Sequence, residues 1–491
     1  MSQLPPHETY RDHLSTVDGS GSRVWLYPKK PSGKFYRWRS YLSYFLLLLL
    51  FGLPFVKVHG DPILLFNVLE GRFIIFGIVF TPQDLHLFAL AMITLMLFVV
   101  LFTVVFGRLF CGWVCPQTIF MEMVFRKIEY WIEGDANQQR RLNRGPWTAT
   151  KVRKKALKHF LFFAIAVLIV HAFLSYLIGV DEVGKIISEP IHQHLGGFVA
   201  MLVFSGLFYG VFAFFREQVC LAVCPYGRLQ DVLLVKDSIV VIYDWVRGEP
   251  RGKMKKKRRA PRPAALAGAT IPYSDGYTAS DVISVPKLGD CVDCRLCVQV
   301  CPTGIDIRNG TQLECVNCTA CMDACDGVMR KINRAEGLIR QDSEHGIKKG
   351  QQKIVTPRVL AYSVVLGLLL VFQVLLFSTR SEVETLILRT PGMLYQEVDE
   401  QHLSNLYNYQ LINKTNLTIQ DLELRLQADY GRIELVGNIP DIPKQELSEG
   451  AFFIILPRAQ LTGRKTRLAI EVYAGGQLID RVKTNFLGPA H

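Results

Sequence analysis

The twelve cysteines of the 491-residue chain lie in four short clusters, a spacing that indicates metal or redox chemistry rather than a disulfide framework. The segments 291–301 and 315–325 both read CxxCxxCxxxC. This is the bacterial ferredoxin run, in which three thiolates bind one cubane and the fourth cysteine binds the other. Zinc sites, the alternative for such cysteines, usually use two separated CxxC pairs rather than this double run.

The double run therefore predicts two [4Fe–4S] clusters with crossed fourth ligands. The first cluster is expected to be bound by Cys291, Cys294, Cys297 and Cys325. The second is expected to be bound by Cys301, Cys315, Cys318 and Cys321.

The remaining cysteines form two CxxxCP motifs, Cys111-Gly-Trp-Val-Cys115-Pro and Cys220-Leu-Ala-Val-Cys224-Pro. If a helix continues through each pair, its two thiols share one face. Thiolates are ligands for Cu(I), zinc or iron–sulfur clusters. We predict that the four thiols form one redox site that binds copper or, as the alternative, a third cluster. The alternative without any chemistry is that these four thiols are buried and unreactive.

Five runs without Asp, Glu, Lys or Arg are long enough, or nearly so, to span a bilayer: residues 40–56, 85–107, 160–180, 195–215 and 359–379. The connecting segments alternate between many and few Lys and Arg residues, which places the N-terminus and all cysteines in the cytoplasm and the tail outside. The segment 63–80 is apolar apart from Glu70 and Arg72, so we expect a re-entrant or surface-lying element there rather than a sixth span.

The tail has strand-like alternation and short apolar runs, separated by glycines, at 422–426, 452–456 and 468–472, which is typical of an immunoglobulin-like β-sandwich. The expected fold class is a multi-domain membrane protein with a five-helix transmembrane bundle, an inserted dicluster ferredoxin-like α+β domain and this sandwich. The expected domains are a cytoplasmic segment 1–39, a region 40–247 with four spans and both CxxxCP motifs, a basic linker 248–280, a ferredoxin-like domain 281–340, a fifth span 359–379 and a periplasmic domain 380–491.

The net charge of +13 is concentrated in the segments assigned to the cytoplasm, so it serves chiefly as an orientation signal. Nucleic acid is not an expected partner. The Lys/Arg cluster of the linker is expected to approach anionic lipid head groups of the bilayer. The first 39 residues are polar and show no cleavable signal peptide, which excludes an ordinary secreted protein.

The ordered combination of CGWVCP, CLAVCP, the double ferredoxin run, a last span and a sandwich tail resembles the FixG/RdxA/CcoG family of cytochrome c oxidase accessory proteins. The resemblance implies a multi-pass protein of the bacterial inner membrane that acts in maturation of cbb(3)-type oxidase. It implies reduction of Cu(II) to Cu(I), with a copper-exporting P-type ATPase, copper chaperones and oxidase subunits as partners. The sequence leaves open whether the protein forms a homodimer.

Three functions follow as hypotheses. The first is a cupric reductase, in which copper is bound near Cys111, Cys115, Cys220 and Cys224. The second is an electron relay from quinol, because the CxxxCP elements also look like those of NapH-type membrane ferredoxins. The third is a non-enzymatic assembly scaffold, in which the sandwich tail binds an oxidase subunit or a copper chaperone.

Overall fold

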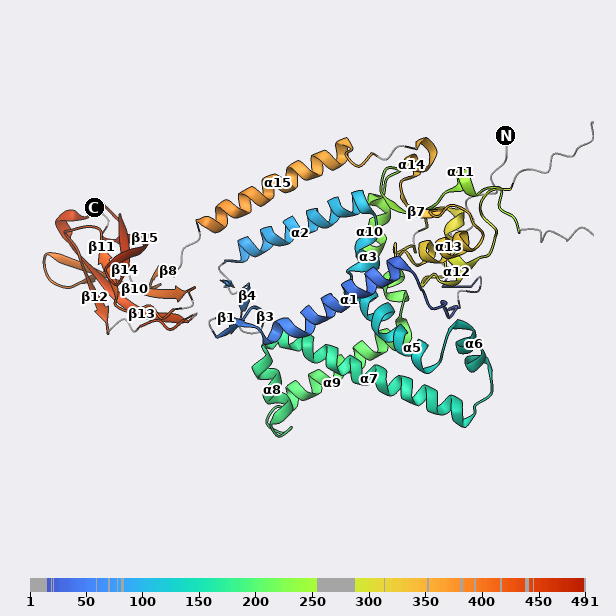
Figure 1. Ribbon diagram of the computed structural model, residues 1–491. Helices are drawn as coiled ribbons and strands as arrows, with labels where there is room; N and C mark the ends of the chain where they lie inside the picture. The colour runs from blue at the N-terminus through green and yellow to red at the C-terminus, as the bar shows by residue number, and fades with distance from the viewer. Residues whose placement is uncertain are drawn as a thin grey trace, which may run out of the picture. The chain divides into compact units, whose positions relative to one another are not determined.

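The computed structural model describes residues 16–489 apart from 19, 21, 59, 69–70, 77, 81–83, 254–287, 313, 351–352, 380–382, 393, 416, 438–440 and 445. The chain divides into two compact units. Figure 1 shows the helices and strands of each unit. The first comprises Met1–Phe51, Leu95–His171 and Pro190–Leu366, and the second comprises Gly52–Thr94, Ala172–Glu189 and Gly367–His491. Most of the predicted basic linker 248–280 lies outside the described residues.

Among the described residues, five helices are long and apolar enough to cross a membrane, as the sequence predicts. They are α1 (Lys34–Gly52), α2 (Leu85–Phe106), α7 (Ala149–Ile178), α9 (Leu195–Gly210) together with the π-helical segment Val211–Phe215 that continues it, and α15 (Pro357–Ser378). Helices α1 and α7 begin before the predicted apolar runs, within segments that contain Lys and Arg. Long basic side chains can extend from such helix ends toward water, so the helix continues beyond its apolar part.

Aromatic side chains form the core between these helices in the first unit. The ring of Phe125 stacks on Phe212 at 4.7 Å between centroids and meets Phe162 edge-on at 4.8 Å. Phe125 and Phe212 belong to the π-helical segments Ile119–Phe125 and Val211–Phe215. The aromatic core therefore joins the chain after the first CxxxCP motif to the chain before the second.

The shorter elements within and after the motifs complete this part of the first unit. They are α3 (Leu109–Trp113), α4 (Pro116–Thr118), α5 (Arg126–Ile132), α6 (Ala136–Arg144) and α10 (Pro225–Leu233).

The ferredoxin-like part of the first unit is built on strand β6 (Val240–Tyr243), which pairs antiparallel with β7 (Ile339–Asp342). Its helices are α11 (Trp245–Gly248), α12 (Leu296–Gln299), α13 (Ala320–Lys331) and α14 (Glu344–Lys349). Every residue of β6 is buried, as expected for an apolar strand inside a core. Because β6 precedes the basic linker, this part of the chain extends outside the predicted 281–340.

The segment 63–80 is a small antiparallel sheet in the second unit, with strands β3 (Leu64–Asn67), β4 (Arg72–Ile75) and β5 (Ile78–Phe80). Strands β1 (Lys57–Val58) and β2 (Asp61–Pro62) pair just before it, and helix α8 (Val180–Ser188) belongs to the same unit. Neither a sixth span nor a re-entrant helix is present in the described part of this segment. Its alternating strand burial, with Leu65, Ile74 and Val79 in a shared core, explains the apolar composition.

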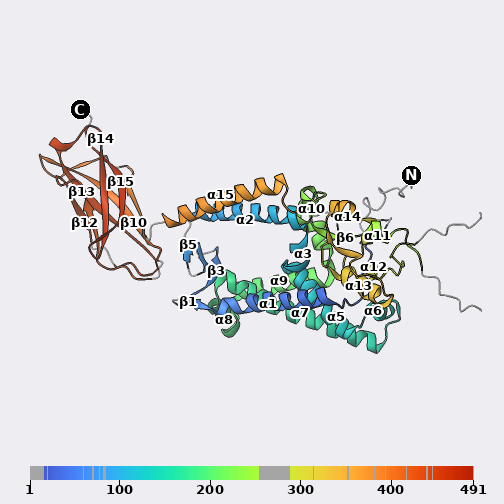
Figure 2. The same ribbon diagram turned by 45° about the horizontal axis from the view of Figure 1, so that its top comes forward.

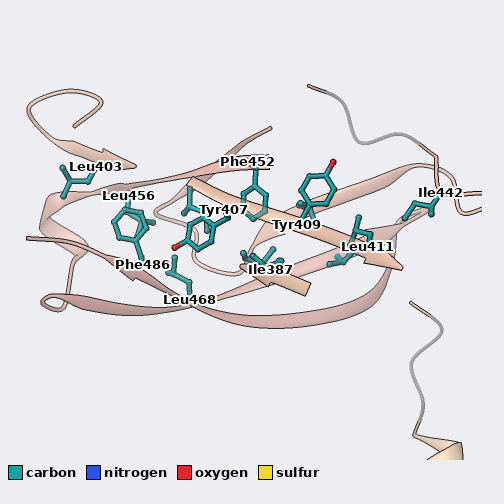
Figure 3. Packing of buried hydrophobic residues seen from close by; sticks show 14 residues of the cluster. Ile387, Leu403, Tyr407, Tyr409, Leu411, Ile442, Phe452, Leu456, Leu468 and Phe486 are labelled. Carbon is teal, nitrogen blue, oxygen red and sulfur yellow. The ribbon is translucent and has the colours of Figure 1, made fainter. Parts of the chain in front are cut away.

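The tail forms a sandwich of two antiparallel sheets. One has the order β12-β13-β10-β8, with β9 also paired to β10, and the other has the order β11-β14-β15. The strands are β8 (Val383–Arg389), β9 (Gln396–Glu397), β10 (His402–Asn413), β11 (Leu422–Leu426), β12 (Arg432–Val436), β13 (Leu447–Pro457), β14 (Lys465–Ala474) and β15 (Gln477–Leu487). Figure 3 shows the core between the sheets, where Tyr407 stacks on Phe452 at 5.6 Å. The predicted strands at 422–426, 452–456 and 468–472 are confirmed.

Candidate functional site

Two small cavities in the ferredoxin-like part are lined by cysteines. One is lined by Cys291, Cys294, Cys297 and Cys325. The other is lined by Cys301, Cys315, Cys318 and Cys321, together with Cys297. The fourth cysteine of each run thus lies at the cavity formed by the other run, which is the crossed arrangement that the spacing predicts.

Both cysteine loops adopt the same unusual backbone conformation. Asp293 and Arg295 have φ angles of 50° and 55°, and the corresponding Asn317 and Thr319 have 50° and 61°. A β-branched threonine rarely adopts a positive φ. Successive residues in right- and left-handed conformations turn their N–H groups toward one point, a geometry that binds anions such as iron–sulfur clusters. The thiol of Cys315 contacts Asn317 of the same loop and donates to its side-chain oxygen at 3.5 Å.

The environment of these thiols fits a metal cluster. Burial raises the pKa of Cys297, Cys315 and Cys325 to about 12, so the thiols are neutral at pH 7 unless a cation binds them. Arg308 lines the cavity of Cys291 and pairs with Asp306 at 2.6 Å. Four soft ligands, convergent N–H groups and a buried cation together match the requirements of an anionic iron–sulfur cluster.

Each CxxxCP motif is a break between two helices and does not place its thiols on one continuous helical face. Helix α3 ends at Trp113, and Cys115 is extended, with ψ at 125°. Cys115 and Cys224 are the N-cap residues of α4 and α10, and the following proline occupies the first helical position. Proline favours this position because it needs no amide hydrogen there. The second thiol of each motif therefore lies at a helix N-terminus.

Polar contacts join the two motifs, which are more than a hundred residues apart in the sequence. The Gln230 amide of α10 donates to the thiol of Cys111 at 3.2 Å. Arg108 donates to the carbonyl of Gly227, and Gln117 donates to the carbonyl of Arg216 at 3.3 Å. In both views α3 lies close to α10, beside the ferredoxin-like part (Figures 1 and 2).

A buried network of ion pairs supports this arrangement. Arg126, which is 1% exposed, pairs with Glu122 at 2.9 Å and with Glu217 at 3.6 Å. Glu129 pairs with Arg216 and, at 3.6 Å, with Lys158. Burial would raise the pKa of Glu129, but Arg216, Lys158 and Arg126 outweigh it and hold that pKa below its usual range. These pairs fix the chain after the first motif against the chain before the second.

The four thiols of the two motifs lie close enough to interact electrostatically. Burial raises the pKa of Cys220 to about 12, and charge repulsion from Cys115, Cys111 and Cys224 adds to the increase. Burial likewise raises the pKa of Cys111 to about 11. Over the residues that the structure describes, no three His, Cys, Asp or Glu side chains are spaced to hold one metal ion.

The first motif lies directly against a ferredoxin loop. A β-carbon on Gly112 would be 2.3 Å from the carbonyl oxygen of Val316, so only glycine fits there. Cys111 packs on a buried cluster that includes Val316 and Cys318. The structure thus brings the redox thiols predicted in the membrane region next to the cavity lined by Cys318.

Several residues of the site are not evident from sequence motifs. Arg308 and Gln230 have no distinguishing pattern around them. Asp323 accepts hydrogen bonds from the backbone N–H groups of Phe35 at 3.1 Å and Tyr36 at 2.8 Å, and thereby caps the start of α1. Its position between two cysteines of the second ferredoxin run was the available signal that it belongs to the site.

Family models match three parts of the chain. Residues 88–134 match a 4Fe-4S binding domain, and residues 215–344 match a 4Fe-4S dicluster domain. Residues 373–489 match the IG-like fold at the C-terminus of FixG. The chain is therefore an iron–sulfur electron-transfer protein with an immunoglobulin-like C-terminal domain and apolar helices typical of a membrane protein.

Three relatives resemble most of this sequence. The nitrogen fixation protein FixG of Rhizobium meliloti is 35% identical over 64% of this chain, and the match spans 56% of FixG. Protein RdxA of Cereibacter sphaeroides is 32% identical over 75% of this chain and 73% of its own length. Protein RdxB of the same organism is 30% identical over 92% of this chain and 94% of its own length. With the thiol motifs, the dicluster region and the sandwich all present, the chain belongs to the FixG/RdxA family.

Proposed function

We propose that the protein is a membrane cupric reductase that prepares copper for assembly of a cbb(3)-type oxidase. Cu(II) is the substrate, and one electron converts it to Cu(I) at the thiols of Cys111, Cys115, Cys220 and Cys224. The observation that carries this proposal is the contact of the first thiol motif with the ferredoxin loop at Val316. When bound, two [4Fe–4S] clusters supply one-electron transfer.

The residues around the thiols favour the reduced ion. Cu(I) is soft and prefers thiolate ligands, whereas oxygen and nitrogen ligands favour Cu(II). Each thiol loses its proton when it binds copper, and the helix N-termini at Cys115 and Cys224 stabilise the resulting negative charge. Gln230 donates to the sulfur of Cys111 and thereby orients it. Binding therefore pulls the redox equilibrium of copper toward Cu(I).

The test is anaerobic Cu(II) reduction by dithionite-reduced, full-length protein, with a Cu(I) chelator as the indicator. Changing Cys111, Cys115, Cys220 and Cys224 together to serine is expected to abolish copper reduction while the iron content of the ferredoxin-like part is retained. The matched control changes Ser175, Ser188, Ser205 and Ser378 to alanine, which leaves every cysteine in place. An undiminished rate in the cysteine variant would contradict the proposal.

A second candidate for the same four thiols is a third iron–sulfur cluster. It is favoured by the match of residues 88–134 to a 4Fe-4S binding domain, a range that includes Cys111 and Cys115. Iron analysis separates the candidates: two clusters give about eight iron atoms per chain, and a third [4Fe–4S] cluster raises this to about twelve. A value near twelve that falls to about eight in the four-serine variant would assign these thiols to a cluster.

A further inference from the structure

An apolar pocket of about 290 Å³ lies in the first unit beside the first CxxxCP motif. It is lined by Phe35, Leu42, Phe102, Leu109, Phe110, Trp113, Val114 and Gln341. Trp113 and Val114 stand between the two cysteines of the motif, so one wall of the pocket is the motif itself. Its volume and aromatic lining are typical of a site for an organic ligand.

One polar group of a lining residue has no partner. The indole N–H of Trp113 is buried and has no hydrogen-bond partner among the described residues. A buried donor without an acceptor is unfavourable, and such groups are rare in folded proteins. An acceptor on a bound ligand would satisfy it. The side-chain amide of Gln341, the only other polar side chain named in the lining, can donate to or accept from the same ligand.

The position of the pocket indicates what kind of ligand it binds. Phe35 lies in the first turn of the apolar helix α1, and Phe102 lies near the last turn of α2. The pocket is thus at the ends of two candidate membrane spans, where a ligand with an apolar tail can enter from lipid. Gln341 pairs in the sheet with Val241, which lines the cavity of Cys301 and Cys315.

We propose that this pocket binds the ring of an isoprenoid quinol, which is the electron donor of the protein. A quinone ring is planar, stacks on aromatic side chains and carries oxygen acceptors, whereas a saturated lipid tail offers the Trp113 N–H no acceptor. Oxidation of one quinol to quinone releases two electrons and two protons. The electrons are accepted singly by the iron–sulfur part, and the protons pass to water at the open mouth of the pocket.

This inference rests on the proposed electron-transfer function, because it names the donor for it. Binding of decylubiquinone to the full-length protein in detergent is measured by titration calorimetry. Leu42→Trp fills the pocket, and Leu48→Trp is its matched control on the same helix, where Leu48 is 68% exposed. Trp113→Phe removes only the indole N–H, and Trp131→Phe is its control at a side chain that is 76% exposed.

We expect Leu42→Trp to abolish binding and Trp113→Phe to weaken it about tenfold, the effect of one lost hydrogen bond, while both controls bind as the parent does. Under anaerobic conditions, decylubiquinol should lower the iron–sulfur absorbance of the parent and of both controls. It should leave the absorbance of Leu42→Trp unchanged. Unchanged binding in both pocket variants overturns the inference. So does equal competition by decanol, which has the chain without the ring and would mark a lipid site.

The same samples separate this inference from the proposed function. Dithionite-driven copper reduction does not need quinol, so Leu42→Trp should retain it. If that reduction is absent from the parent protein while decylubiquinone still binds at the pocket, the cupric reductase proposal fails and the quinol site stands. If dithionite-driven copper reduction is intact and decylubiquinone does not bind, the quinol site is wrong and the cupric reductase proposal stands.

Discussion

The backbone of Gly112 lies against the carbonyl of Val316, with room for no side chain between them. This contact joins the membrane thiol motif to the ferredoxin loop that contains Cys315 and Cys318. Electron transfer between two sites depends on their separation and orientation. A glycine in the middle of the CxxxCP motif is therefore a requirement of the contact.

Gly112→Ala tests the contact directly. The added β-carbon would also be 2.9 Å from the carbonyl carbon of Asn317, so one segment must move. We expect the displacement to slow dithionite-driven copper reduction several-fold with iron content unchanged, because electron transfer weakens as two sites separate. Gly206→Ala is the control, because a β-carbon there meets nothing within 4 Å. Equal rates in the two variants would show that the contact is irrelevant to transfer.

Cys325→Ser and Cys301→Ser test the crossed ligands. Each change should remove one cluster and about half of the iron. In Cys325→Ser the surviving cluster should be the one in the cavity of Cys315, and in Cys301→Ser the one in the cavity of Cys291. Adding Cys291→Ser to Cys325→Ser should then remove no further iron. Adding Cys291→Ser to Cys301→Ser should remove the remaining iron. The opposite pattern would assign each fourth cysteine to its own run.

Arg308→Gln should lower the reduction potential of the cluster in the cavity of Cys291. Arg308 lines that cavity and neutralises Asp293 and Asp306, and a nearby cation favours the more negative, reduced state of a cluster. We expect a shift of about 60 mV, which is a tenfold change in a one-electron equilibrium. Arg308→Lys keeps the charge and should stay close to the parent in an EPR-monitored titration. Equal shifts in both variants would point to lost packing instead of lost charge.

Glu129→Gln should destabilise the first unit by about 3–5 kcal/mol, because it leaves Arg216 buried without its anion and removes one of the two carboxylates paired with Lys158. The folded pKa of Glu129 lies below its unfolded value of 4.5, so its ionised form stabilises the fold above that value. This contribution is lost as the pH falls through the folded pKa. Thermal unfolding in detergent should show a lower midpoint at pH 7 for Glu129→Gln and a weaker decline on acidification.

Glu182→Gln is the matched control, because its pair with Lys185 is half exposed on both sides. Exposed pairs contribute little to stability, so its unfolding midpoint should stay near that of the parent. An equal fall in both variants would argue against a special role for the buried network.

Local patterns were sufficient to predict the separate parts. Apolar length determines a membrane span, and cysteine spacing determines a cubane site, because both depend on residues close in the sequence. The strand at 422–426 was predicted to the residue for the same reason. The segment 63–80 was expected to be a re-entrant or surface-lying element, and its apolar residues form a small sheet whose strand pairing is not visible in composition.

The sequence by itself determined the cofactor class, the five spans and the sandwich. Only the tertiary structure decided how the CxxxCP motifs are built and what they meet. The sequence left open whether a helix continues through each motif. In the structure the proline after Cys115 starts a new helix and places the second thiol at its N-terminus. The meeting of Cys111 with Gln230, and of Gly112 with Val316, depends on packing between segments more than a hundred residues apart. Such contacts follow from the sum of many burial and ion-pair energies, which no short motif encodes.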